Sequence, residues 1–117
     1  LAAEGHDWEG VGVQILRARA AAEEQGASFA LVFFPMLYHS AGALVSEKLA
    51  LALGAFASEH GIAFLDLHPT FVGRPLEPLR VHPDDYHFSA AGHRLAGVAT
   101  AEFLAQQGLL RFARPPR

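Results

Sequence analysis

Two short apolar runs constrain the fold of this chain more than any other feature of the sequence. Residues 28–34 and 62–67 are rich in aromatic and branched side chains, and glycine or proline lies close to both ends of each run. Runs of this length and composition are typical of strands buried on both faces, as in a parallel sheet. Because both faces of such strands need apolar cover, we expect the rest of the chain to supply helices.

Three segments have the apolar spacing of amphipathic helices: residues 8–25, 42–60 and 90–107. Their apolar residues recur three or four positions apart, so one side of each helix can face a core. A polar capping residue, Asp7 or Ser89, precedes the first and the third segment. A glycine follows each segment, at Gly26, Gly61 and Gly108.

The predicted order is helix, strand, helix, strand, a long irregular loop over residues 68–88, and a final helix. Alternation of helices and strands indicates an α/β fold in which parallel strands are joined by right-handed crossovers. Two strands are too few for a stable parallel sheet, so we expect an incomplete fragment of such a fold. A preceding segment or a second copy of the chain would then cover the exposed sheet edge. Residues 109–117 are expected to form a loose tail.

Composition narrows the classes of function. The 117 residues have a formal net charge of −3, and their Lys and Arg side chains are scattered singly, which argues against a nucleic-acid partner. The absence of cysteine excludes disulfides, thiolate metal sites and a cysteine nucleophile. No apolar run approaches the roughly 18 residues of a membrane span.

The residues most relevant to chemistry lie just before the third predicted helix. Asp84 and Asp85 precede His87 by three and two positions. A carboxylate at this spacing can accept the Nδ1–H of the imidazole and leave Nε2 free to take a proton from a nucleophile. The local spacing alone is equally compatible with a surface loop that has no catalytic role.

The run Asp84-Asp85-Tyr86-His87-Phe88-Ser89-Ala90-Ala91-Gly92-His93 resembles the last conserved block of SGNH (GDSL-type) esterases. The resemblance implies a flavodoxin-like three-layer α/β/α fold, with residues 1–117 forming the C-terminal part of a single SGNH domain. It also implies a serine hydrolase that cleaves a small carboxylic or carbohydrate ester without a cofactor. His87 would be the general base and Asp84 the preferred orienting acid, with Asp85 as the alternative.

The sequence departs from the family pattern at the nucleophile. The Gly-Asp-Ser block of SGNH enzymes has no counterpart here, and neither do the Gly and Asn blocks that complete the oxyanion hole. We therefore expect the chain alone to be inactive and the nucleophilic serine to lie outside it. The alternative function is a non-catalytic α/β domain that binds a partner or associates with itself.

Several other polar and aromatic residues are weaker candidates. Tyr38 and His39 follow the first predicted strand and are candidates for lining the acyl or alcohol pocket, while Phe88 either lies beside the active site or packs in the core. Ser40 resembles a nucleophile elbow only loosely and is expected to be a loop or cap residue.

The remaining histidines and Asp66 are expected to have structural roles. The spacing of the histidines at positions 82, 87 and 93 is weak evidence for a metal site, so no metal is expected. Asp66 is expected to accept hydrogen bonds from backbone N–H groups, and His68 to be structural or solvated.

Overall fold

A computed structural model of the chain describes residues 8–40, 43–44 and 46–110. Most of the tail expected to be loose lies outside the described residues. The helices are α1 (Trp8–Glu24), α2 (Glu47–Glu59), α3 (His68–Phe71) and α4 (Ala90–Gln106), with a 3-10 turn η1 (Glu77–Leu79). The strands are β1 (Ala30–Phe33), β2 (His39–Ser40), β3 (Ala43–Leu44), β4 (Ala63–Asp66), β5 (Arg80–His82) and β6 (Asp85–Phe88).

The strands β1 and β4 form the parallel pair that the two apolar runs predict. Their register aligns Ala30 with Ala63 and Phe33 with Asp66, so both strands end at the same edge. The other strands form two antiparallel pairs, β2 with β3 and β5 with β6. The mixed α/β class and the parallel pairing are thus confirmed.

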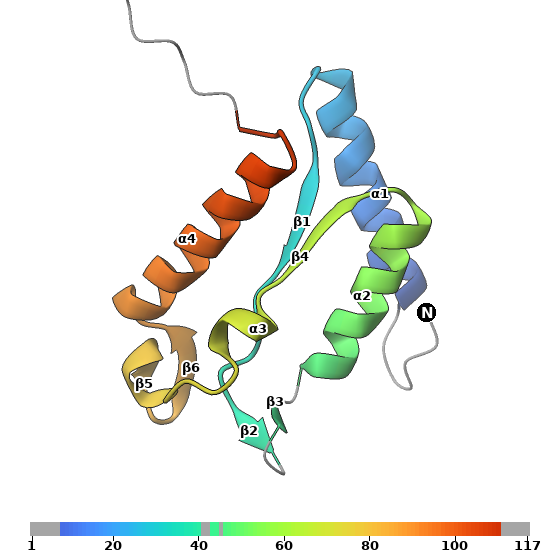
Figure 1. The fold of residues 1–117 in the computed structure, drawn as a ribbon. Helices are drawn as coiled ribbons and strands as arrows, with labels where there is room; N and C mark the ends of the chain where they lie inside the picture. Colours follow the sequence, from blue (N-terminus) through green and yellow to red (C-terminus); the bar gives the residue numbers. More distant parts are fainter. Residues whose placement is uncertain (1–7, 41–42, 45, 111–117) are drawn as a thin grey trace, which may run out of the picture.

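Helices cover both faces of the β1–β4 pair (Figure 1). Val32 and Leu65 pack against a core cluster that includes Ala96 of α4. Leu31 and Phe64, whose side chains point to the opposite face, pack against a second cluster that includes residues of α2, and side chains of α1 pack against the same cluster. Alternation of side chains along a strand explains why consecutive residues contribute to different cores.

The segment between β4 and α4 is more regular than the sequence predicts. Residues 68–88 contain α3, η1 and the β5–β6 hairpin, so the expectation of an irregular loop was wrong. Most side chains of the two short strands are exposed, and their sequence therefore lacks the apolar alternation by which strands are recognised. The helix predicted over 42–60 begins only at Glu47 because β3 precedes it.

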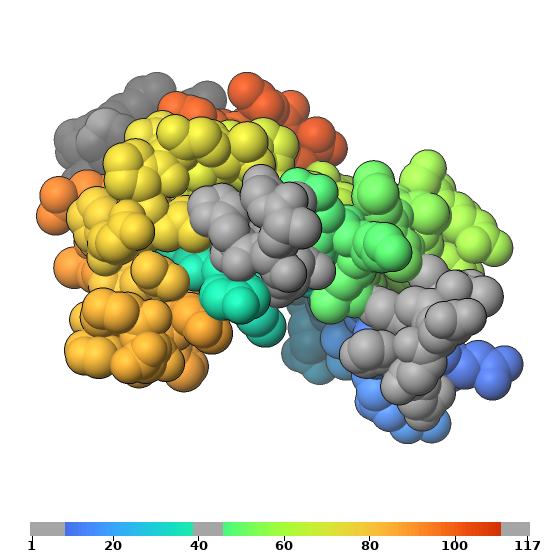
Figure 2. Space-filling view, turned by 90° about the horizontal axis from the view of Figure 1, so that it is seen from below, coloured from blue at the N-terminus to red at the C-terminus, as the bar shows by residue number. Residues whose placement is uncertain are grey.

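The carboxyl ends of β1 and β4 lie at one end of the molecule. Figure 1 shows that α3, the β2–β3 pair and the β5–β6 hairpin gather at this end. Figure 2 views the same end, with the yellow and orange residues from α3 to β6 on one side and the green α2 on the other. The carboxyl edge of a parallel sheet is where α/β proteins place their ligand sites.

Candidate functional site

His87 and Asp85 form a hydrogen-bonded pair on strand β6. Nδ1 of His87 lies 2.5 Å from Oδ1 of Asp85, and the same oxygen accepts the backbone N–H of His87 at 3.0 Å. The His87 side chain is 89% exposed and that of Asp85 45%. With Nδ1–H donated to the carboxylate, Nε2 carries the free lone pair, and it has no partner in the described part of the chain.

Asp84, the preferred acid from the sequence, does not contact His87. Its backbone N–H donates to Nδ1 of His82 at 3.2 Å, and in the described residues its carboxylate forms no hydrogen bond. The structure therefore favours Asp85, the alternative acid, as the partner of His87. The local reason is that two-residue spacing lets one carboxylate oxygen reach both the backbone N–H and the imidazole of the same residue.

The hydrogen bonds to Asp85 also affect its protonation. The backbone N–H of His87, followed by its imidazole, lowers the pKa of Asp85 below the usual range for an aspartate. Hydrogen bonds donated to a carboxylate favour its charged form. The carboxylate that orients His87 is thus held ionised.

The hairpin that carries this pair is anchored to the start of α4. The Ser89 hydroxyl donates to the carbonyl of Pro78 at 2.7 Å and accepts the N–H of Gly92 at 3.2 Å, which confirms Ser89 as the helix cap. A Cβ at Gly92 would lie 2.6 Å from the carbonyl oxygen of Leu79. Only glycine therefore permits this approach between α4 and the segment leading into β5.

His87 and Asp85 line a cleft of about 740 Å³ at the carboxyl edge of the sheet. The lining also includes Met36 and Leu49, from the loop after β1 and from α2. The complete lining consists of Phe33, Phe34, Pro35, Met36, Ser46, Leu49, Asp84, Asp85, Tyr86 and His87. A largely apolar cleft with a few convergent polar groups is typical of a small-molecule site.

The aromatic candidates from the sequence lie near this cleft but outside its lining. The Tyr38 ring contacts Tyr86 with centroids 5.0 Å apart, and Tyr38 lines a neighbouring cleft of about 320 Å³. Phe88 is half-buried and packs edge-on against Phe71, so the core alternative applies to it. The backbone of His39 belongs to β2, while its side chain is outside the described part of the structure.

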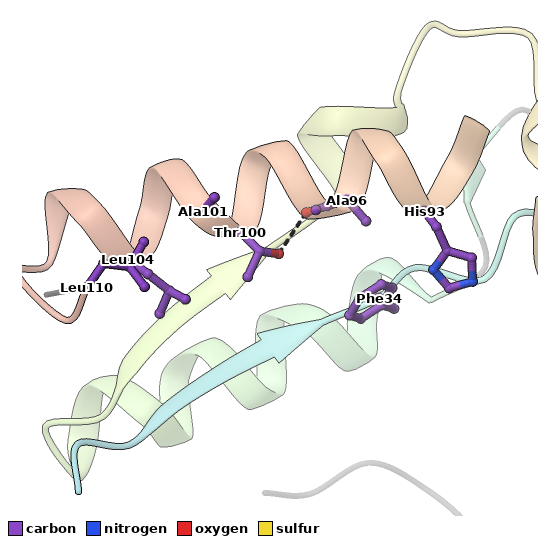
Figure 3. A pocket seen from close by; sticks show the side chains of 8 residues that line it. Phe34, His93, Ala96, Thr100, Ala101, Leu104 and Leu110 are labelled. Carbon is purple, nitrogen blue, oxygen red and sulfur yellow. Dashed lines mark hydrogen bonds between the residues drawn. The ribbon is translucent and has the colours of Figure 1, made fainter. Parts of the chain in front are cut away.

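A third cleft, of about 380 Å³, runs along α4, and few of the side chains that line it could take part in a reaction. Figure 3 shows Phe34 and His93 at one end and Leu104 and Leu110 at the other. Thr100 uses its hydroxyl within the helix, donating to the carbonyl of Ala96 at 2.7 Å. His93 is the one ionisable side chain of this lining.

A second Asp–His pair, missed by the sequence analysis, lies at the end of β4. Nδ1 of His68 is 2.6 Å from Oδ1 of Asp66, and that oxygen accepts the His68 backbone N–H at 2.9 Å. The role expected for Asp66, accepting a backbone hydrogen bond, is confirmed. The imidazole is buried, and its Nε2 lies 3.0 Å from Oγ of Ser46, so the hydrogen bonds extend from Asp66 through His68 to Ser46. The Asp-x-His spacing could have suggested the pair, but nothing in the sequence indicates Ser46.

Comparison of the chain with models of known protein families, with curated proteins and with solved structures finds no match. In the described ranges, no three acidic or histidine side chains come together to hold a metal ion. No described helix is long and apolar enough to cross a membrane.

Proposed function

We propose that this chain supplies the acid–base pair of an SGNH-type serine ester hydrolase with a flavodoxin-like α/β/α fold. His87 is the general base, and Asp85 orients it. The observation that carries the proposal is the hydrogen bond from Nδ1 of His87 to Asp85, which leaves Nε2 free beside a largely apolar cleft. This is the arrangement that activates a serine hydroxyl.

In the proposed reaction, Nε2 of His87 takes the proton of the nucleophilic serine as its oxygen attacks the ester carbonyl. The resulting imidazolium faces the Asp85 carboxylate, which offsets its charge. Nε2 then returns the proton to the leaving alcohol, and water hydrolyses the acyl-enzyme by the same relay. The serine that His87 serves lies outside this chain, and small carboxylic or carbohydrate esters are the substrates.

Ester hydrolysis by the intact gene product tests this proposal. With p-nitrophenyl acetate and butyrate, we expect turnover that His87→Ala reduces by about 100-fold or more, as for the loss of a general base. His82→Ala is the matched control, because His82 is an exposed histidine in the same hairpin. A His87→Ala rate equal to wild type would overturn the assignment.

The two neighbouring aspartates sharpen the test. Asp85→Asn should reduce kcat by as much as about 10⁴-fold, because an amide no longer holds the required imidazole tautomer. Asp84→Asn should leave kcat within about twofold, since its carboxylate has no contact with His87. The opposite ranking would restore Asp84 as the orienting acid.

A non-catalytic, self-associating domain is the second candidate. In the described residues, β1 and β4 pair only with each other, so each presents an unpaired edge. Unpaired strand edges are templates for pairing with another chain. This alternative predicts a stable oligomer in light scattering and an intact protein whose ester hydrolysis does not depend on His87.

A further inference from the structure

Ser46, His68 and Asp66 form a continuous hydrogen-bonded relay inside this chain. Oγ of Ser46 is 3.0 Å from Nε2 of His68, and Nδ1 of His68 is 2.6 Å from Oδ1 of Asp66. We propose that these residues form a second nucleophilic site, in which Ser46 is acylated by small apolar esters. The proposal does not depend on the function of His87.

The hydrogen-bond partners fix the direction of the relay. The Asp66 carboxylate can only accept, so Nδ1 of His68 carries a proton, and in the neutral imidazole Nε2 is then the acceptor. The Ser46 hydroxyl must therefore donate to Nε2, and its oxygen in turn accepts the backbone N–H of Met36 at 2.9 Å. Each group is in the state that a serine nucleophile and its base require.

The Ser46 side chain does not cap α2. It stands at the N-cap position of α2, where serine side chains usually accept an N–H of the first turn, but its side chain makes no such bond. The hydroxyl points instead to His68, 22 residues further along the chain. Capping therefore does not account for this serine.

The position of Ser46 in the fold suits nucleophilic attack. It lies at the carboxyl edge of the sheet and immediately before a helix of 13 residues, so negative charge developing beside it is favoured by the helix dipole. The backbone N–H of Glu47, the next residue, has no partner in the described part of the chain and is available to a developing oxyanion.

The cleft that Ser46 lines indicates the class of substrate. Ser46 is 8% exposed and shares the cleft of about 740 Å³ with Phe33, Met36 and Leu49. The His68 side chain behind it is 5% exposed and stacks on the Phe33 ring, with centroids 5.5 Å apart. An ester with a short apolar acyl group fits this setting, because apolar walls exclude water from the acyl-serine.

The acylation of Ser46 needs only the ester, the serine hydroxyl and the imidazole of His68. The Ser46 oxygen forms a bond to the ester carbonyl carbon while its proton passes to Nε2 of His68. The tetrahedral intermediate then collapses, the bond to the alkoxide breaks, and the alkoxide takes the proton from Nε2. The products are acyl-Ser46 and an alcohol, with His68 again neutral.

A biotinylated alkyl fluorophosphonate tests the proposal on the 117-residue chain. Attack by Ser46 forms an oxygen–phosphorus bond and expels fluoride, which leaves a stable adduct. Tryptic cleavage after Arg19 and Lys48 yields one peptide containing Ser28, Ser40 and Ser46, and tandem mass spectrometry identifies the modified serine. We expect the label on Ser46 in the folded chain and its loss when the chain is unfolded in urea.

Four variants complete the design. Ser46→Ala should abolish the label, and Asp66→Asn should slow labelling by about 100-fold or more. Ser40→Ala and His82→Ala are the controls and should label at the wild-type rate, because His82 is exposed and lies outside the lining of the cleft. Circular dichroism checks the fold of each variant, and the wild-type comparison with urea remains decisive if Asp66→Asn unfolds.

Two results would overturn the proposal: no label on the folded wild-type chain, or label spread over several serines at equal rates. Neither result affects the His87 assignment, which is tested by hydrolysis in the intact protein. Conversely, loss of the His87 assignment leaves the labelling of Ser46 unchanged.

Discussion

The chain contains the same local motif twice, in opposite surroundings. In Asp66-x-His68 and in Asp85-x-His87, one carboxylate oxygen accepts both the backbone N–H and Nδ1 of the histidine. The His68 side chain is 5% exposed and that of His87 89%. Two-residue spacing therefore sets the orientation of the imidazole, while the packing around it decides what Nε2 can reach.

The difference comes from the elements that follow each aspartate. His68 begins α3 directly beneath the edge where β1 and β4 end, so its ring is enclosed by Phe33 and Ser46. His87 lies on a short hairpin whose side chains are mainly exposed. Substitutions at equivalent positions of the two pairs should thus have unequal effects.

Replacing the two histidines should give the largest contrast. His68→Ala should lower the free energy of unfolding by about 2–4 kcal/mol, because it opens a cavity and leaves Ser46 and Asp66 without their partner. His87→Ala should change it by no more than about 0.5 kcal/mol, as for an exposed residue. Urea denaturation measures both, and equal losses would show that burial does not distinguish the pairs.

Disturbing the contact between α4 and the hairpin that carries Asp85 and His87 should have the next largest effect on stability. Gly92→Ala should cost about 1–3 kcal/mol, because its Cβ would meet the Leu79 carbonyl oxygen at 2.6 Å. Gly97→Ala in the same helix meets no atom within 4 Å and should stabilise by about 0.5–1 kcal/mol. Thermal unfolding followed by circular dichroism compares the two, and a stable Gly92→Ala would contradict the close approach.

Replacing the two aspartates by asparagine should give a smaller contrast. Asp66→Asn should lower the free energy of unfolding by about 1–2 kcal/mol, because the charge-assisted bond to buried His68 becomes a neutral one. Asp85→Asn should have a clearly smaller effect, since water replaces its bonds at an exposed site. A larger loss for Asp85→Asn in urea denaturation would reverse the ranking.

The smallest effect concerns pH. Because hydrogen bonds to His87 lower the pKa of Asp85 in the folded chain, Asp85 contributes stability above its unfolded pKa. That contribution is lost as the pH falls through the folded pKa. A carboxyl-carbon NMR titration should show a lower midpoint for Asp85 in the folded chain than in urea. Identical midpoints would mean that the hydrogen bonds to His87 do not stabilise the carboxylate.

The sequence predicted the elements well where periodicity is strong. The 8–25 and 90–107 helices match α1 and α4 closely, and the two apolar runs contain β1 and β4. The hairpin β5–β6 escaped prediction because its side chains are mainly exposed and follow no apolar alternation. Short strands of this kind depend on backbone pairing and on their anchoring to α4.

The candidate site was predicted in part. His87 and the two competing aspartates were identified from spacing, but the choice of Asp85 required the geometry of the hairpin. Ser46 was missed because its partner is 22 residues away and because the helix predicted over residues 42–60 included Ser46 itself, whereas α2 begins only at Glu47.

The sequence by itself determined the order of helices and strands, the parallel pairing and the capping of α4, because these follow from short-range patterns of apolar and polar residues. It also placed an aspartate two positions before His68 and before His87, but the structure was needed to show that Asp66 and Asp85 are the partners of these histidines. Only the tertiary structure decided that His68 is enclosed while His87 is open, and that Ser46 meets His68. Burial and long-range contacts depend on how α2, β4 and the hairpin pack around the sheet edge, which no local pattern specifies.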